Sequence, residues 1–174
     1  MRLLAAIGFL AVVAIVGAGI YFLGGYYSVA TTWEDPAIVK LALVQVRSAS
    51  VRAQAKAVAS QAADDPALVQ RGAQAFLARG CVNCHGAPGV GWAKFAEGLN
   101  PGPADLKEIA GARAPREIFW VIKNGIRMTG MPGFAAAGVD DAEIWAITAF
   151  VTKLPSVTDD AFKTWTATPA RPGG

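Results

Sequence analysis

The feature that most restricts this chain is a five-residue window, Cys81-Val82-Asn83-Cys84-His85, which holds both of its cysteines and its single histidine. C-x-x-C-H is the pattern through which c-type haem is attached: the thiols add to the haem vinyl groups, and the neighbouring imidazole reaches the iron. A redox C-x-x-C does not need the histidine, and a zinc site needs four ligands, typically Cys or His, which this sequence does not supply. The window therefore predicts one covalently attached haem c, with Cys81 and Cys84 as attachment sites and His85 as an axial ligand of the iron.

A long apolar stretch lies near the start of the chain. Residues 3–23 contain no charged side chain, Arg2 precedes them, and the next charge is Glu34. A helix over this stretch would be about 31 Å long, which is enough to cross the hydrocarbon core of a membrane. Four aromatic residues lie where the membrane–water interface would be: Tyr21, Tyr26, Tyr27 and Trp33. We therefore expect residues 1–30 to form an N-terminal signal-anchor, a transmembrane helix.

The alternative for this stretch is a cleaved signal peptide. Ser28-Val29-Ala30 has the small-x-small pattern of a cleavage site, although the apolar core of a signal peptide usually has only about 7–15 residues. In both cases Arg2 stays inside and the rest of the chain crosses the membrane. Since c-type haem is attached on the outer side in bacteria, we expect a single-pass protein of the bacterial inner (cytoplasmic) membrane with its haem domain in the periplasm.

Charge argues against a nucleic-acid partner. The formal net charge is +3, and residues 66–155 carry nine Lys or Arg against seven Asp or Glu, a surplus that two haem propionates would cancel. No basic run with interleaved aromatic residues is present in the sequence. We expect a membrane and redox proteins as partners, and no nucleic acid.

Beyond the anchor, the pattern predicts three further segments. Residues 31–65 are expected to be a helical spacer, residues 66–155 the haem domain, and residues 156–174 an extended tail. Within the haem domain, capping and breaking residues predict helices over 67–79, 115–124 and 141–153, with a loop between 86 and 114. On a helix, the charged residues of this segment are expected to face outward, as on a helical spacer: Lys40, Arg47, Arg52 and Lys56. The same charges also fit a basic amphipathic helix on anionic lipid, but the spacer interpretation is favoured.

The sixth ligand of the iron has few candidates in this sequence. There is no second histidine, and the only thioether sulfurs belong to Met1, Met128 and Met131. Met1 lies at the wrong end of the membrane segment. Met131 precedes Pro132, which fixes the backbone and makes the loop rigid, so Met131 is preferred to Met128. Lys123 and an open coordination site remain as alternatives.

With these residues in view, the chain resembles the class I (mono-haem) c-type cytochromes, in a membrane-anchored bacterial form, over residues 66–155. The resemblance rests on the following residues: Gly72, Phe76, Cys81-x-x-Cys84-His85, Gly102-Pro103-Ala104-Asp105-Leu106, Asn124-Gly125, Met131-Pro132, Ile147 and Phe150. It implies an all-α class I cytochrome c fold around one covalent haem, in which the first and last helices cross closely at Gly72.

The resemblance also implies roles for individual residues. His85 and Met131 would be the axial ligands, and the carbonyl of Pro103 would accept a hydrogen bond from the imidazole of His85. Trp120 and Lys123 are expected near the edge of the haem, within reach of a propionate. Because the protein would fill both axial positions, the haem would carry electrons and the chain would have no catalytic residues of its own.

The function that follows is that of a membrane-anchored carrier of single electrons in a respiratory chain. Its donor would be a quinol-oxidising complex or a dehydrogenase, and its acceptor a terminal oxidase or reductase. A close alternative is a fixed haem c subunit of a larger membrane oxidoreductase complex. A third reading, gas or peroxide binding with a labile Met131, would need a distal acid or base, and the sequence alone does not place Glu97, Asp105 or Arg127 on that side.

Overall fold

The computed structural model describes residues 1–61 and 63–167, and the chain divides into two units, Met1–Glu34 and Asp35–Gly174. The first unit holds one helix, α1 (Arg2–Leu23), none of whose residues is buried. By length and composition α1 is able to cross a membrane, as expected for the N-terminal apolar stretch. Each unit is described separately below.

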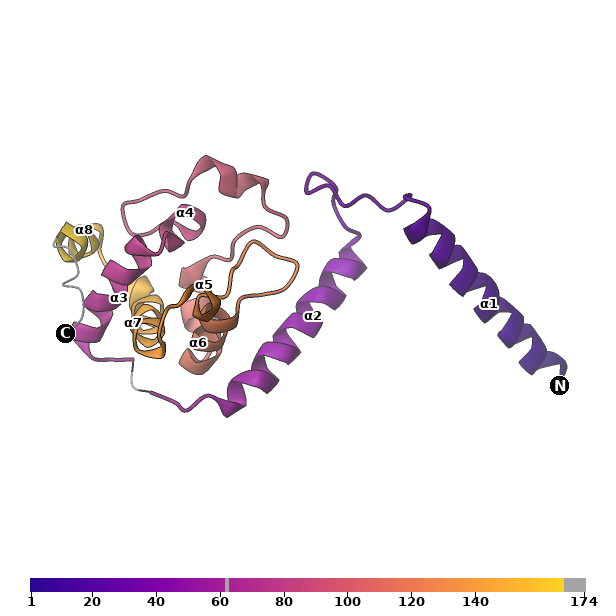
Figure 1. The fold of residues 1–174 in the computed structure, drawn as a ribbon, viewed down its shortest axis with the longest axis horizontal. Helices are drawn as coiled ribbons and strands as arrows, with labels where there is room; N and C mark the ends of the chain where they lie inside the picture. The colour runs from indigo at the N-terminus through magenta and orange to yellow at the C-terminus, as the bar shows by residue number, and fades with distance from the viewer. Residues whose placement is uncertain (62, 168–174) are drawn as a thin grey trace. The chain divides into compact units, whose positions relative to one another are not determined.

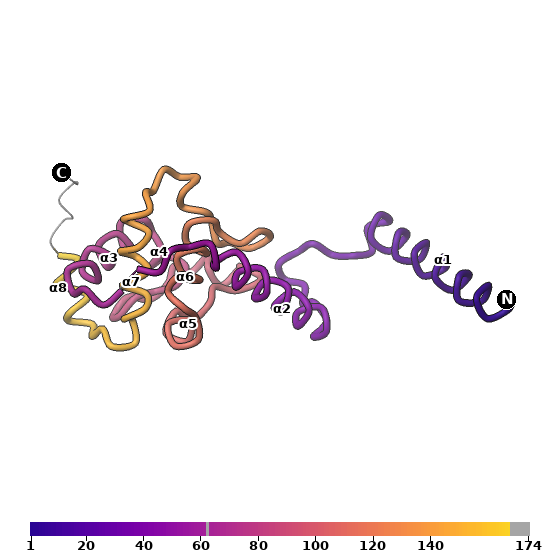
Figure 2. The backbone as a smooth tube through the Cα atoms, turned by 90° about the horizontal axis from the view of Figure 1, so that it is seen from below, coloured from indigo at the N-terminus to yellow at the C-terminus, as the bar shows by residue number. Residues whose placement is uncertain are grey.

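The second unit is built from helices, and no strand occurs in the residues described. Figures 1 and 2 show how these helices wrap around one another. Its α-helices and 3₁₀ turns are, in chain order, α2 (Ala37–Gln54), η1 (Ala55–Ala57), α3 (Pro66–Ala78), α4 (Cys81–His85), η2 (Lys94–Gly98), α5 (Leu106–Ala112), α6 (Pro115–Asn124), η3 (Ala135–Ala137), α7 (Asp141–Lys153), η4 (Leu154–Ser156) and α8 (Asp159–Ala167). The expected all-α architecture is confirmed.

Aspartates begin three of these helices. The side chain of Asp65 accepts a hydrogen bond from the backbone N–H of Ala67, and Asp105 and Asp140 cap α5 and α7 in the same way. Each cap satisfies a backbone donor that the first turn of a helix leaves without a partner. The cap at Asp140 lies where the sequence pattern predicts it.

The close crossing of α3 and α7 forms the centre of the core. A Cβ atom added at Gly72 would lie 1.9 Å from the carbonyl oxygen of Ala146, so only glycine allows the two backbones to approach this closely. Next to the crossing, the rings of Phe76 and Phe150 lie 5.2 Å apart, and Ile147 is 1% exposed. The crossing therefore agrees with the one that the class I resemblance implies.

The structure differs from the sequence-based expectation in two segments. Residues 106–112, expected to be loop, form the short helix α5, and residues 159–167 of the expected extended tail form α8. Phe162 of α8 is 2% exposed and stacks on Phe150, Trp165 packs partly buried against the same core, and the carbonyl of Trp165 accepts a hydrogen bond from Gln74 of α3, so these contacts dock α8 on the core. Such short helices show too few turns for a clear periodic pattern, since their stability comes from tertiary packing. Residues 168–174 of the tail lie outside the described residues.

The segment expected to be a helical spacer also packs on the haem domain in part. The first part of α2 is exposed, but Ser48 and Val51 near its end are buried, and Ala55 of η1 is fully buried. The end of α2 and η1 contact α6. The charges of this segment were expected to face outward, but Arg47 is half-buried and lines an internal cavity.

Candidate functional site

The C-x-x-C-H window folds into a single short helix, α4. Gly80 before it has a φ of +75°, and Gly86 after it has a φ of +65°, so two glycines in backbone conformations that other residues rarely adopt isolate the window as one turn. Residues three apart lie on the same side of a helix. Cys81 and Cys84 therefore lie side by side and line a cavity.

His85 is oriented by a backbone carbonyl. Its Nδ1 lies 3.0 Å from the carbonyl oxygen of Ala104. This corrects the expectation that Pro103 supplies the acceptor: the Pro103 side chain lines the cavity instead, and the hydrogen-bonded carbonyl belongs to the next residue. The direction of a carbonyl depends on the backbone dihedral angles of its own residue, which the Gly-Pro motif does not specify.

Burial shifts the pKa values of Cys81 and His85. It raises the pKa of the Cys81 thiol to about 11. Burial also lowers the pKa of His85, while its hydrogen bond with Ala104 acts in the opposite direction. The imidazole is therefore neutral at pH 7, which is the form that binds a metal. Because Nδ1–H donates to the Ala104 carbonyl, the lone pair of Nε2 is directed away from that carbonyl and would be available to bind a haem iron.

The two methionine candidates lie in different places. Met131 is half-buried and lines the cavity, whereas Met128 is 89% exposed and does not line it. Met128 also has a φ of +60°, which turns the chain sharply between the two residues. Lys123, the other alternative, pairs through Nζ with Asp141 at 2.8 Å and also does not line the cavity.

Three hydrogen bonds hold the loop that carries Met131. The hydroxyl of Thr129 donates to the carbonyl of Ile126 at 2.7 Å and accepts from the backbone N–H of Met131 at 3.1 Å. The N–H of Ile126 in turn donates to the carbonyl of Met131 at 3.1 Å. The loop is thus closed on itself, as the rigid Met131-Pro132 segment predicts, and Thr129 is a positioning residue that the sequence reading missed.

Two glycines bring this loop against the end of α6. A Cβ at Gly125 would lie 2.6 Å from the nitrogen of Gly133, and a Cβ at Gly133 would lie 2.8 Å from the carbonyl oxygen of Asn124. Gly125 also has a φ of +70°. The Asn124-Gly125 pair of the sequence motif therefore allows the end of α6 to pack directly against the backbone of Pro132 and Gly133, and this contact fixes the position of Met131.

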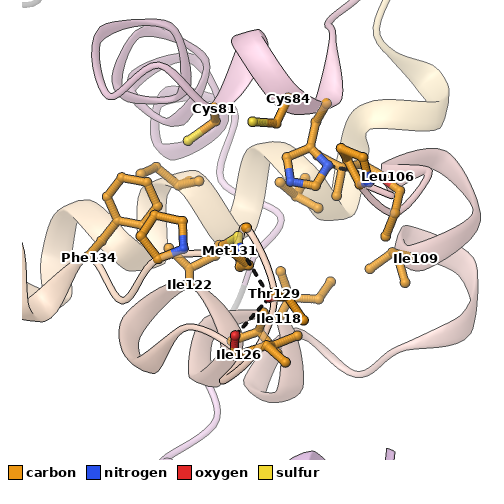
Figure 3. Close-up of a pocket in the computed structure, with 18 of the residues that line it drawn as sticks. Cys81, Cys84, Leu106, Ile109, Ile118, Ile122, Ile126, Thr129, Met131 and Phe134 are labelled. Atoms are coloured by element: carbon orange, nitrogen blue, oxygen red, sulfur yellow. Dashed lines mark hydrogen bonds between the residues drawn. The ribbon is translucent and has the colours of Figure 1, made fainter. Parts of the chain in front are cut away.

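The cavity between these groups has a volume of about 340 Å³. Figure 3 shows Cys81 and Cys84 at one end of the cavity and Met131 further into it, with the apolar side chains of Ile122 and Phe134 beside Met131. Two thiols for the vinyl groups, an oriented imidazole, a facing thioether and an apolar lining fit a flat haem c macrocycle. In the residues described, no three His, Cys, Asp or Glu side chains converge on a bare metal site.

The polar residues expected near the edge of the haem lie elsewhere. Trp120 and Lys123 do not line the cavity, and Lys123 lies over the ring of Phe119 in addition to its pair with Asp141. The arginines that do line it are Arg47, Arg79 and Arg113. No sequence pattern pointed to Arg47 or Arg113, because both are brought to the cavity by tertiary packing.

Part of the chain is similar to a known family. Residues 67–151 match a family model described as Cytochrome C oxidase, cbb3-type, subunit III. The matched segment begins in α3 and ends in α7, so it contains Cys81, Cys84, His85 and Met131 but neither α1 nor α2. No curated protein and no solved structure shows a significant match to the chain.

Proposed function

We propose that this class I c-type cytochrome, which binds one covalent haem c and has an N-terminal apolar helix, transfers single electrons within a membrane oxidase complex. That it is an electron-transfer haem protein follows from its cytochrome c domain. The finer statement, a fixed place in a complex, is supported by the printed description of the matched family as an oxidase subunit. This description favours the fixed subunit over the free carrier that the sequence alone favours.

The observation that carries the electron-transfer role is that His85 and Met131 line the same cavity. When bound, haem c supplies a one-electron iron couple, and a His/Met pair of ligands raises its reduction potential. The chain holds the imidazole neutral and oriented through Ala104, and it holds the thioether through Thr129 and Gly125. With both axial positions filled by side chains, no position is left for a substrate.

The lining of the cavity also argues against gas or peroxide chemistry. Glu97, Asp105 and Arg127, the residues that could have served as a distal acid or base, do not line the cavity. Glu97 and Asp105 line a second pocket, which is also lined by Cys84 and His85 but not by Met131, so they lie on the side of His85. Arg127 is exposed. Next to Met131, the Thr129 hydroxyl is already engaged with the Ile126 carbonyl. We therefore propose that the chain has no catalytic residue of its own.

The ligand assignment is tested with two single variants of the full-length holoprotein, Met131→Ala and Met128→Ala. Ferric haem with a Met ligand shows a weak long-wavelength charge-transfer band. Met131→Ala should abolish this band and let the ferrous protein bind CO rapidly, while Met128→Ala should leave both properties unchanged. If only Met128→Ala removes the band, the assignment of Met131 is wrong.

The place in a complex is tested by purification of the full chain from membranes in a mild detergent. A fixed subunit should co-purify with a stoichiometric oxidase partner through size-exclusion chromatography. If the cytochrome elutes alone while the membrane oxidase activity elutes intact and separately, the chain is a free carrier, which is the alternative that the anchor allows.

The location in the membrane is part of the same proposal: α1 retained in the bacterial inner membrane and the haem domain in the periplasm. The apolar helix α1 supports the anchor. Intact mass of the membrane-bound protein should include residues 1–30, and protease added to spheroplasts should digest the haem domain. A mass that lacks these residues would show that the helix is a cleaved signal peptide.

A further inference from the structure

The lining of the haem cavity becomes polar at one end. Arg47 and Ser48 reach it from α2, and Arg113 and Glu117 reach it from the start of α6 and the residues just before it. Arg113 Nη2 donates to the hydroxyl of Ser48 at 2.9 Å, and its Nη1 lies 3.7 Å from Glu117 Oε2. Figure 3 shows Ile118, the residue after Glu117, at the end of the cavity away from Cys81 and Cys84.

The charged side chains at this end of the cavity are partly buried, and more of them are positive than negative. Two guanidinium groups, of Arg47 and Arg113, face one carboxylate, and the side chains of Arg113 and Glu117 are only 25% and 13% exposed. Charges withdrawn from water need partners of opposite sign. A guanidinium has five N–H donors, more than the two contacts of Arg113 use, and its planar fork matches a carboxylate.

The haem carries carboxylates that could pair with these arginines. Its two propionates lie on the edge of the macrocycle opposite the vinyl groups. Because Cys81 and Cys84 would hold the vinyl edge at one end of the cavity, the propionate edge would be directed to the other end. Figure 3 shows Ile118 of α6 at that end, and the cavity is also lined by Arg113, just before α6, and by Arg47.

We infer that Arg47 and Arg113 bind the haem propionates, and that the end of α2 is a wall of the haem cavity. This site lies partly outside the matched segment 67–151, since Arg47 and Ser48 belong to α2. Val51 and Ala55 are 7% and 0% exposed, so the end of α2 and η1 are packed against the domain and hold Arg47 and Ser48 in place. Glu117 orients Arg113 from the opposite side to Ser48.

The test uses the full-length holoprotein in detergent and the variants Arg47→Gln, Arg113→Gln and the double variant. Arg52→Gln on α2 and Arg116→Gln on α6 are the matched controls, because both arginines are exposed and neither lines the cavity. Two properties are measured: the resonance Raman bending mode of the propionates, and the reduction potential between pH 5 and 9.

Each cavity variant should shift the propionate Raman mode, and the double variant should shift it most. Loss of a guanidinium raises the propionate pKa, and a protonated propionate favours ferrous iron. The potential of the variants should therefore rise on acidification at a pH at least about one unit higher than in the wild type, a tenfold change in proton affinity. Both control variants should follow the wild type.

Arg113→Lys separates the propionate contact from a general structural role. It keeps the charge but not the fork, so it should restore the pH profile of the potential in part and leave the Raman mode shifted. Circular dichroism and covalent haem content verify that each variant is folded. If Arg47→Gln and Arg113→Gln are folded and match their controls in both measurements, the propionate site is wrong. These readouts concern the isolated holoprotein, so they do not depend on whether the chain is a complex subunit or a free carrier.

Discussion

The two walls of the haem cavity are built in different ways. On one wall, Cys81, Cys84 and His85 belong to a single short helix, and one backbone hydrogen bond from Ala104 orients the imidazole. On the other wall, Met131 sits in a loop whose position depends on contacts with Thr129 and the end of α6. Covalent bonds to the haem would reinforce the first wall, whereas the contacts described for the second wall are all non-covalent.

This difference indicates which mutations should change the ligation of the iron and which should change only the stability of the fold. If His85 and Met131 are the axial ligands, as proposed, the imidazole next to the two cysteines would stay near the iron, whereas the thioether of Met131 would leave when its loop loosens. Mutations that disturb the Met131 loop should therefore change ligation before they unfold the protein. Mutations near α4 should change global stability while the spectrum stays the same. Four predictions test this comparison.

The largest effect should come from Gly72→Leu, because both walls depend on the crossing of α3 and α7. The new Cβ would meet the backbone oxygen of Ala146, which cannot rotate away. We expect a loss of about 3 kcal/mol or more in the free energy of unfolding, measured by denaturant titration of the holoprotein. Gly111→Ala, in open space on α5, is the control and should be neutral or stabilising. Equal stability of Gly72→Leu and the wild type would contradict the close crossing.

Gly125→Ala should act on the Met131 wall alone. The substitution forces a residue with a Cβ into a φ of +70° and against the backbone of Pro132 and Gly133. We expect a loss of about 2 kcal/mol together with a weaker ferric charge-transfer band. Gly138→Ala has a similar φ of +80° but open space around it, so it should cost about 1 kcal/mol and leave the band unchanged. A charge-transfer band of equal intensity in Gly125→Ala and Gly138→Ala would show that Gly125 does not position Met131.

Thr129→Val should loosen the loop without a clash. It removes the hydroxyl that joins Ile126 to Met131, at a cost of about 1 kcal/mol. Added imidazole competes with Met131 for ferric iron, and its affinity should rise about fivefold. Thr152→Val removes a hydroxyl that bonds to Thr148 within α7 and should leave the imidazole affinity as it is. An unchanged affinity in Thr129→Val would mean that the loop is held by other contacts.

The smallest effect should come from Arg79→Gln, next to the covalently linked wall. Arg79 pairs with Glu143 through two hydrogen bonds of 2.7 and 2.8 Å, which tie the end of α3 to α7, and Glu143 raises the pKa of Arg79. Since the pair is partly exposed, at 40% and 29%, its loss should cost about 0.5–1 kcal/mol, less at high salt, with no spectral change. Glu143→Gln should cost a similar amount. A change in the charge-transfer band in either variant would contradict the separation of the two walls.

Much of the fold could be predicted from the sequence because the signals are local. The apolar run, the caps at Asp65 and Asp140 and the C-x-x-C-H window each lie within one segment, and the structure has a helix at each of them. The helices α5 and α8 were missed, since each has at most nine residues and depends on partners far along the chain.

The candidate site was also predicted in part. Met131 could be preferred from its neighbouring proline, but Ala104 in place of Pro103 could not be foreseen, because the direction of one carbonyl is a tertiary detail. Arg47 was read as an outward charge of a spacer, and only the packing of Val51 and Ala55 brings it to the cavity.

The sequence by itself determined the cofactor, its attachment residues and the apolar helix, because these need only consecutive residues of the right type. The tertiary structure decided which methionine lines the cavity together with His85, which carbonyl orients His85 and which arginines line the cavity. These features depend on contacts between residues that are far apart in the chain. They depend on the close approach of backbones at Gly72 and Gly125 and on the burial of α2 against α6, and no short sequence pattern records such packing.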